Sequence, residues 1–350
     1  MKRSNLKDEM AAFLKHFEPY SRNYFERKIR QSRQISPLVS RFYKDLADFS
    51  SGGKRMRAFL VWVGYQVGSP PSRKASVDKI LPISLATEVI HSFLLIHDDI
   101  IDKSETRHGD LTIHKRYEKL VDSHYGLSQA ILLGDIACFE ALELINSSSF
   151  EDGIKVICQS RLLKTLLETG YGQVLDVEST YRGGSLRKIR QVMDLKTARY
   201  SFVGPLTIGA ILGGAGKDQI SSLTKFGLSC GMAFQLKDDV LGVFGDEKLT
   251  GKPMDLHEGK NTMLIYKTYE LANAKEKANL KRIWGNRQAN LQDLKRVQQI
   301  IKECGALAWC EREQAKLVNK AKEEVTNITN NNELRRILFE IADFVIKRDK

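Results

Sequence analysis

Three aspartates at the end of a long apolar run are the residues of this chain best suited to chemistry. The run, PISLATEVIHSFLLIHDDIIDKSETR at residues 82–107, contains Asp98, Asp99 and Asp102. On a helix, Asp98 and Asp102 lie one turn apart on one face, and Asp99 lies about 100° round the cylinder from Asp98. Carboxylates this close repel one another, and a hard cation such as magnesium relieves that repulsion. The segment predicts a metal and phosphate site, although a solvated acidic helix end would fit the same residues.

A second acidic pair repeats the arrangement 238 − 98 = 140 residues later. In FQLKDDVLGVFGDE, residues 234–247, another apolar stretch leads to Asp238 and Asp239, and Gln235 lies about one turn earlier. Motifs this far apart can face each other only in a bundle of helices around a shared cavity. Two such pairs, each followed by cations, favour a ligand site over solvated surface.

Cations at several points extend this pattern. In SSGGKRMR, residues 50–57, two glycines precede Lys54 and Arg57, and cations three positions apart at a helix start can bind an anion. A solvated basic turn is the alternative, and the spacing of a Walker A loop is absent. His91 lies two turns from Asp98 on the same face and is a candidate phosphate donor. Arg107 follows the first motif, and its guanidinium fits phosphate oxygens. Lys196 would need an acidic neighbour or a ligand if it is buried. Lys252 and Lys260 follow the second motif.

The elements that must hold these residues are helices. In residues 1–50, aromatic and apolar side chains recur at the spacing of an amphipathic helix, and Pro19 and Pro37 are expected at helix breaks or starts. The chain has only 7 prolines and no long linker, so we expect a single domain over residues 1–350, with 1–50 as a helical extension for packing or dimer contacts. Further helical patterns cover residues 58–145, 155–232 and 262–350. Small residues recur in 155–232, where they would allow close helix packing.

Composition narrows the classes of partner. Lysine plus arginine exceed aspartate plus glutamate by 55 − 43 = 12, which suits nucleic acid, an anionic membrane or a phosphorylated small molecule. The excess is dispersed without a nucleic-acid motif, so no nucleic-acid partner is expected. Five scattered cysteines without a CxxC pair indicate a reducing, cytoplasmic compartment. No signal sequence is recognised, and no apolar run is expected to span a membrane.

Together, GGKRMR, HDDIIDKSETRHG, KTA and FQLKDDVLGVFGDEKLTGKP…EGKNT resemble the trans-polyprenyl diphosphate synthases, which elongate isoprenoid chains head to tail. The resemblance runs from about Ser51 to the C-terminus. It implies an all-α, isoprenoid synthase-like bundle around a deep central cavity, and a homodimer. It also implies that isopentenyl diphosphate and an allylic diphosphate are the substrates, and that three magnesium ions are the cofactors.

The resemblance also implies a role for each candidate residue. Asp98 and Asp102 would hold two magnesium ions and Asp238 the third, with Asp99 and Asp239 completing the two acidic motifs. The allylic diphosphate would be bound, with help from Lys260, by Arg107, Lys196 and Lys252. Isopentenyl diphosphate would be bound by Lys54, Arg57 and His91. The reacting carbons would be lined by Thr197 and Gln235, which with Lys196 are the catalytic candidates.

This sequence departs from the family pattern at four places. His108 stands where a second arginine usually contacts isopentenyl diphosphate, which would weaken that contact or make it pH-dependent. Ala58 replaces a proline, and Gly242 replaces the fifth-position aspartate of the second motif. The loop after Lys252 is shorter than usual, which leaves the alignment of Lys260 open.

Product length depends on the residues that precede the first acidic motif. Phe93 and Leu94 occupy the fifth and fourth positions before Asp98, and a single aromatic at the fifth position resembles the geranylgeranyl diphosphate synthases. Ideal helix geometry places Leu94 and Leu95 more directly below the aspartates than Phe93. Farnesyl or longer products remain alternatives. So do a class I terpene cyclase, a non-catalytic subunit of a heteromeric synthase and a helical nucleic-acid binder.

Overall fold

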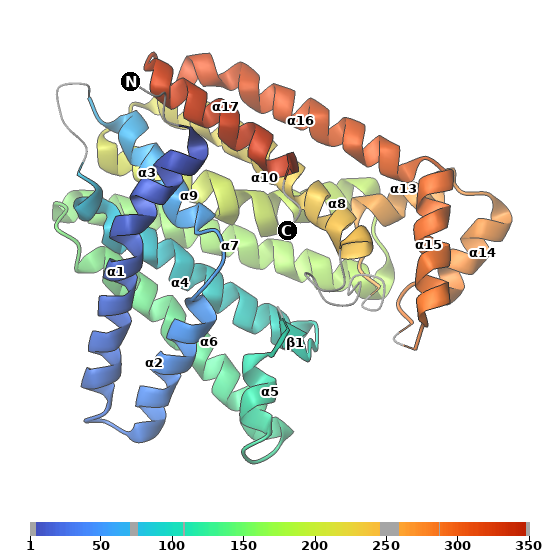
Figure 1. Ribbon diagram of the computed structural model, residues 1–350, viewed down its shortest axis with the longest axis horizontal. Coiled ribbons are helices and arrows are strands. Elements are labelled where there is room, and N and C mark those ends of the chain that lie inside the picture. The colour runs from blue at the N-terminus through green and yellow to red at the C-terminus, as the bar shows by residue number, and fades with distance from the viewer. Residues whose placement is uncertain (1–4, 71–75, 108, 246–258, 287, 348–350) are drawn as a thin grey trace. The chain divides into compact units, whose positions relative to one another are not determined.

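The computed structural model describes residues 5–70, 76–107, 109–245, 259–286 and 288–347 (Figure 1). In that part of the chain the secondary structure is helical apart from one antiparallel pair of two-residue strands, which confirms the all-α prediction. The elements are α1 (Leu6–Ser32), α2 (Pro37–Ser50), α3 (Met56–Gly68), α4 (Val77–Ile101), β1 (Thr106–Arg107), β2 (Asp110–Leu111), α5 (Ile113–Glu118), α6 (Ser123–Asn146), α7 (Asp152–Arg182), α8 (Leu186–Val192), the π-helix η1 (Met193–Val203), α9 (Gly204–Gly213), α10 (Lys217–Phe244), α13 (Met263–Leu271), α14 (Ala274–Ile283), α15 (Leu291–Glu303), α16 (Ala306–Ile328) and α17 (Asn332–Lys347).

The chain divides into two compact units, which are described separately. Unit 1 comprises Met1–Leu162 and Pro205–Ile220, and unit 2 comprises Leu163–Gly204 and Ser221–Lys350. Helices α7 and α10 each contribute residues to both units. Neither unit is therefore one contiguous stretch of chain.

The core helix of unit 1 is α4, which packs against α1, α2, α3, α5 and α6. By length and composition α4 is the one described helix that could cross a membrane, so the expectation that no apolar run is long enough was wrong. However, 67% of its most apolar window is buried inside the protein, as in the core helix of a soluble protein. The apolar composition of α4 is explained by this burial.

The two prolines of the N-terminal region have different positions. Pro37 is the first residue of α2, directly after the N-cap Ser36, as expected. Pro19 lies inside α1, so the expected break there was wrong. An interior proline costs about 3 kcal/mol. Phe13 and Phe17, buried one turn apart with ring centroids 5.5 Å apart, anchor α1 despite that cost.

A buried carboxylate ties the α1–α2 hairpin to α6. Glu140 of α6 accepts hydrogen bonds from Tyr24 of α1 at 2.5 Å and from Tyr43 of α2. Lys28 of α1 lies 2.7 Å from the same carboxylate. Burial raises the pKa of Glu140, but the hydrogen bonds from Lys28, Tyr24 and Tyr43 and the Lys28 charge outweigh burial, so the pKa lies below its usual value. The ionised form of Glu140 therefore stabilises unit 1.

We expect Glu140→Gln to lower the free energy of unfolding by about 3 kcal/mol at pH 7, because the half-buried Lys28 loses its anionic partner and the Tyr24 and Tyr43 hydroxyls lose a charged acceptor. A carboxyl with a depressed pKa in the folded state stabilises fully above its unfolded pKa of 4.5, and it loses that contribution as the pH falls through the folded pKa. The wild-type and Glu140→Gln stabilities should therefore converge below pH 4.5. Denaturant titrations at pH 7 and at acidic pH measure this, with the exposed Glu143→Gln on the same helix as control. If the difference in stability between wild type and Glu140→Gln were the same at acidic pH as at pH 7, the ionised form of Glu140 would not be the source of the stabilisation.

In unit 2, α7 and α10 each contact the π-helix η1 through a glycine. A Cβ at Gly172 of α7 would lie 2.4 Å from the backbone nitrogen of Lys196, and a Cβ at Gly231 of α10 would lie 2.5 Å from the Cα of Ala198. The small residues for which the sequence predicts close packing include Gly170 and Gly172, and the prediction is confirmed at Gly172. It is wrong for Gly170, where a Cβ would meet nothing within 4 Å.

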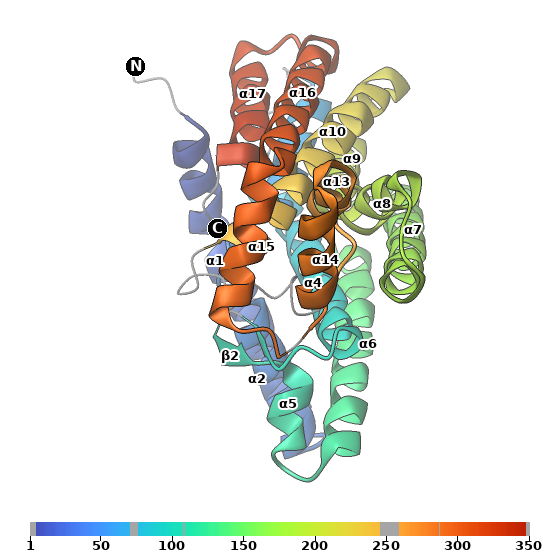
Figure 2. The ribbon, with the colours of Figure 1, turned by 90° about the vertical axis from the view of Figure 1, so that its right-hand side faces the viewer.

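The C-terminal helices of unit 2 form a second apolar core with α8 and α10. Leu236 and Val243 of α10 are buried in a cluster with Leu264 of α13, Val297 of α15 and Cys310 of α16. Helices α16 and α17 pack side by side (Figure 2). This core supports the end of α10 that carries the second acidic pair.

All five cysteines are free thiols. Cys158 in unit 1 and Cys230 and Cys310 in unit 2 are buried. Burial raises the pKa of Cys158 and of Cys310 to about 12. Burial therefore favours the protonated form of these thiols.

Candidate active site

The three aspartates of the first motif, at the end of α4, differ in burial and in hydrogen bonding. Asp99 is 1% exposed, and Arg107 of β1 donates to it from Nε at 3.0 Å and from Nη2 at 2.6 Å. Asp98 and Asp102 are half-buried and one turn apart, with the Asp102 N–H donating to the Asp98 carbonyl at 2.8 Å. Asp99 thus orients Arg107, whereas Asp98 and Asp102 are more exposed than Asp99.

The hairpin after α4 holds Arg107 in this position. Arg107 pairs with Asp110 across the turn, and Gly109 has φ 89°, which a residue with a side chain rarely adopts. The guanidinium is partly buried against Asp99, an arrangement that fixes its plane. His108 lies outside the described residues.

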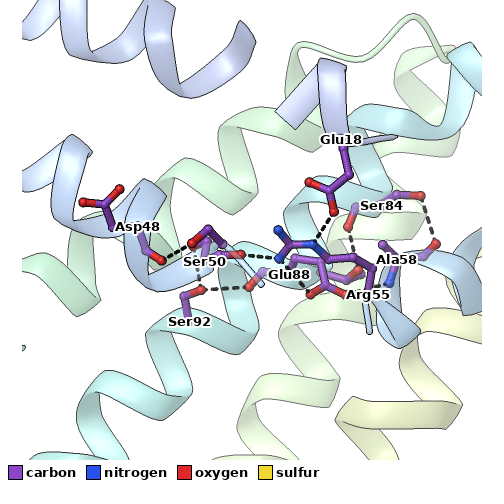
Figure 3. A network of polar contacts seen from close by, with 10 residues as sticks. Glu18, Asp48, Ser50, Arg55, Ala58, Ser84, Glu88 and Ser92 are labelled. Atoms are coloured by element: carbon purple, nitrogen blue, oxygen red, sulfur yellow. Dashed lines mark hydrogen bonds and ion pairs between the residues drawn. The ribbon is translucent and has the colours of Figure 1, made fainter. Parts of the chain in front are cut away.

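The basic turn before α3 has the open backbone that the sequence predicts. Gly52 and Gly53 have φ of 84° and 71°, and Lys54 is exposed while Arg57 is half-buried. Sequence reasoning passed over Arg55, which is buried and has a left-handed φ of 50°. Figure 3 shows its guanidinium among Glu18, Ser50 and Glu88.

The spacing of Glu88, His91, Asp98 and Asp102 predicts that all four lie on one polar face of α4. His91 is half-buried, but Glu88, which the sequence places on the same polar face, is 7% exposed. Its Oε1 accepts a hydrogen bond from the N–H of Ala58 at 2.9 Å. Glu88 is therefore a buried structural residue, because the free N–H groups at the start of α3 need acceptors.

Phe93 and Leu94 are both half-buried on α4. The ring of Phe93 contacts that of His97 edge-on, with centroids 4.9 Å apart. His97 Nε2 lies 3.2 Å from the carbonyl oxygen of Ile131 on α6, and a Cβ at Gly134 would lie 2.3 Å from the same imidazole nitrogen. α6 thus holds His97, and His97 in turn restricts Phe93.

In unit 2, the half-buried Lys196 has an acidic partner, and a separate hydrogen-bonded chain leads to the second acidic pair. Lys196 of η1 donates to Asp176 of α7 at 2.6 Å, which confirms that this lysine has an acidic neighbour. Thr197 donates to Gln235 Oε1 at 2.6 Å, and Gln235 Nε2 donates to Asp239 at 2.8 Å.

The two aspartates of this second pair also differ in their surroundings. Asp239 is 4% exposed and accepts a further hydrogen bond from the N–H of Met263 at 3.3 Å, whereas Asp238 is half-buried. The second acidic pair therefore repeats the division seen in the first. Lys260 lies just before α13, and Lys252 lies outside the described residues.

A metal ion fits the half-buried carboxylates only if it also binds other oxygen ligands. Within the described residues, no three His, Cys, Asp or Glu side chains gather closely enough to hold an ion by themselves. Magnesium typically takes one or two carboxylates and completes its shell with water and phosphate. Asp98 and Asp102, on successive turns of α4, match that donor set.

Known proteins that resemble this chain are named for prenyl diphosphate synthesis. The profile of the Polyprenyl synthetase family matches residues 38–301. The chain is 31% identical to a geranylgeranyl diphosphate synthase of Methanosarcina mazei, over 85% of this chain and 87% of that protein. It is 32% identical to one of Saccharolobus solfataricus, over 91% of this chain and 94% of that protein. A crystal structure of geranylgeranyl pyrophosphate synthase from Corynebacterium glutamicum, complexed with isoprenyl diphosphate and magnesium, has a TM-score of 0.88 and 27% identity over 96% of this chain and 99% of that one.

Proposed function

This chain belongs to the polyprenyl synthetase family of prenyltransferases, and we propose that it condenses isopentenyl diphosphate with an allylic diphosphate to a short-chain all-trans prenyl diphosphate. One observation carries the proposal. In each unit the second aspartate of the motif, Asp99 or Asp239, is buried and hydrogen-bonded within the protein, and the aspartate directly before it is half-buried. Solvated acidic helix ends would not need such anchoring.

Magnesium is the proposed cofactor. Asp98 and Asp102 of unit 1 would hold two ions, and Asp238 of unit 2 a third. When bound, magnesium neutralises the charge that develops on a departing diphosphate. Support comes from the donor chemistry of these carboxylates and from the magnesium in the C. glutamicum relative.

The basic residues of the chain are proposed to bind the two diphosphates. The allylic diphosphate would contact Arg107 and Lys196, each of which a carboxylate already orients, together with Lys252 and Lys260. Isopentenyl diphosphate would be bound by Lys54, Arg57, His91 and His108. Fixing two anionic substrates in alignment supplies much of the rate, because it removes the entropy of their encounter.

The proposed reaction begins when the allylic C–O bond breaks, which leaves a diphosphate anion and an allylic carbocation. The alkene of isopentenyl diphosphate attacks the cation, and the departed diphosphate accepts the proton that is then lost. Thr197 donates its hydroxyl hydrogen to Gln235, so the Thr197 oxygen presents lone pairs rather than its proton. That orientation is suited to stabilising a nearby positive charge.

Geranylgeranyl diphosphate is the proposed product. Support comes from two relatives with that activity in their names and from the single aromatic at Phe93. The contact of Phe93 with His97, which α6 holds in turn, gives the ring a fixed position from which it can limit the growing chain. Farnesyl or longer products are the alternatives.

We expect Phe93→Ala to lengthen the products by at least one isoprene unit, because removing the ring opens space beneath the aspartates. Chromatographic sizing of the products measures this, with Leu94→Ala as the neighbouring variant on the same helix. A distribution that shifts only for Leu94→Ala would move the limit to Leu94. Unchanged distributions for both variants would show that neither residue limits the product.

A homodimer in the cytoplasm is the proposed assembly and location. The residues Leu163, Leu167, Tyr171 and Val174 form a stripe along α7 in which each side chain is 46–68% exposed. An apolar stripe this exposed is typical of a protein interface. A second copy of the chain would cover it, and light scattering of the purified protein tests this assembly.

One assay tests the proposed function against its rivals. Purified protein with magnesium, isopentenyl diphosphate and each allylic primer in turn should consume isopentenyl diphosphate and release a longer prenyl diphosphate. Cyclised hydrocarbon without consumption of isopentenyl diphosphate would indicate a terpene cyclase. No turnover without a second protein would indicate a non-catalytic subunit.

A further inference from the structure

Arg55 lies between two cations proposed to bind isopentenyl diphosphate, yet its side chain has a different environment. Lys54 is exposed and Arg57 half-buried, whereas Arg55 is 8% exposed. Its φ of 50° is left-handed, a backbone conformation that residues with a side chain rarely adopt. Such a conformation persists only where the surroundings fix it.

The guanidinium of Arg55 is held by three helices. Its Nε donates to Glu18 of α1 at 2.9 Å, and Nη1 donates to the carbonyl of Ser50, the last residue of α2. Nη1 also lies 3.9 Å from Glu88 of α4. With two carboxylates beside it, the Arg55 charge is compensated within the protein, so Arg55 is suited to anchoring and not to binding a diphosphate.

A row of side chains on α4 fixes both ends of the same turn (Figure 3). Ser84 donates to the Ala58 carbonyl at 3.2 Å, and Glu88 accepts from the Ala58 N–H at 2.9 Å. One turn further on, Ser92 is 2.7 Å from the hydroxyl of Ser50. All three α4 residues are buried. The turn is thus attached to α4 at its start and its end, and Arg55 attaches its middle.

We propose that Arg55 is a positioning residue, which with the α4 row sets the placement of Lys54 and Arg57 and so the affinity for isopentenyl diphosphate. This inference rests on the proposed function. Gly52 and Gly53, with φ of 84° and 71°, restrict the backbone less than residues with side chains would, so we infer that the geometry of the turn depends on these anchors. The two oriented cations of the allylic subsite, Arg107 and Lys196, have their own partners in Asp99 and Asp176. Loss of Arg55 should therefore affect one substrate and spare the other.

The test is Arg55→Met, assayed by steady-state kinetics with each substrate varied in turn. We expect the KM for isopentenyl diphosphate to rise about tenfold or more, with the KM for the allylic diphosphate and kcat within about threefold of wild type. Arg55→Lys keeps the charge but lacks the planar guanidinium, so its KM for isopentenyl diphosphate should lie between those of wild type and Arg55→Met. The control is Lys28→Met, which removes the ion pair of the half-buried Lys28 with Glu140 and should lower Tm without changing either KM.

A second variant keeps the test decisive if Arg55→Met does not fold. Glu88→Gln retains an oxygen acceptor for the Ala58 N–H and removes the charge opposite Arg55, so it should raise the same KM about threefold. Equal rises in both KM values, or a fall in Tm with neither KM changed, would overturn the inference and leave the proposed function standing. A wild-type protein that does not consume isopentenyl diphosphate would overturn both.

Discussion

Replacing Asp98 by asparagine should lower kcat by about 10²–10³-fold, because the variant loses a carboxylate proposed to hold magnesium against the departing diphosphate. The magnesium concentration that gives half-maximal activity should rise as well, since an amide oxygen is a weaker ligand for a hard cation. Stability should change little, because Asp98 is half-buried on the last turn of α4. Initial rates over a magnesium titration measure both effects.

The matched control for this variant is Glu105→Gln. Glu105 is an exposed acid in the segment that follows α4, so the change in charge is the same and the distance along the chain is short. We expect it to keep kcat within about twofold of wild type. Equal rates for Asp98→Asn and wild type would remove Asp98 from the proposed magnesium site.

Gly172→Ala should be nearly as damaging to turnover although residue 172 carries no functional group. The added methyl carbon would lie 2.4 Å from the Lys196 nitrogen and 2.8 Å from the Lys196 Cα, so η1 must move. A displacement of about 1 Å at a substrate-positioning group can cost 10²-fold in rate. Overpacking of this kind also costs about 1–3 kcal/mol of stability. Kinetics and denaturant titration measure the two losses.

Gly170→Ala, two residues earlier on α7, is the control for this prediction. A Cβ there meets nothing within 4 Å, so the substitution adds a good helix former without a clash. Stability should be unchanged or rise by up to about 1 kcal/mol, with kcat retained. Similar behaviour of the two variants would mean that α7 does not constrain η1 at Lys196.

Local patterns were sufficient to predict the helices and one contact of the candidate site. Lys196 in an apolar helix was expected to need an acid or a ligand because burying an unpaired ammonium is costly, and Asp176 supplies the acid. The contact between Gln235 and Asp239 agrees with their spacing of four residues on one helix, but the sequence pattern had placed Gln235 one turn before Asp238 instead.

Other contacts could not be predicted, because they join segments that only the folded chain brings together. Glu88 belongs to a polar face by spacing, but its partner Ala58 lies 30 residues earlier. The left-handed backbone of Arg55 could not be predicted, because the neighbouring Gly52 and Gly53 are the residues expected to adopt such angles. Glu140 receives donors from residues 97 and 116 positions away. The division of each aspartate pair into a buried and a half-buried member likewise depended on such partners.

The buried thiols give this chain built-in reporters of local opening. Cys158 belongs to unit 1, whereas Cys230 and Cys310 belong to unit 2, and burial suppresses the thiolate that alkylating reagents require. Each thiol becomes modifiable only when its surroundings open to solvent. Mass spectrometry of peptides from timed alkylation would therefore rank the opening rates of the two units in one unmodified protein, without any introduced label.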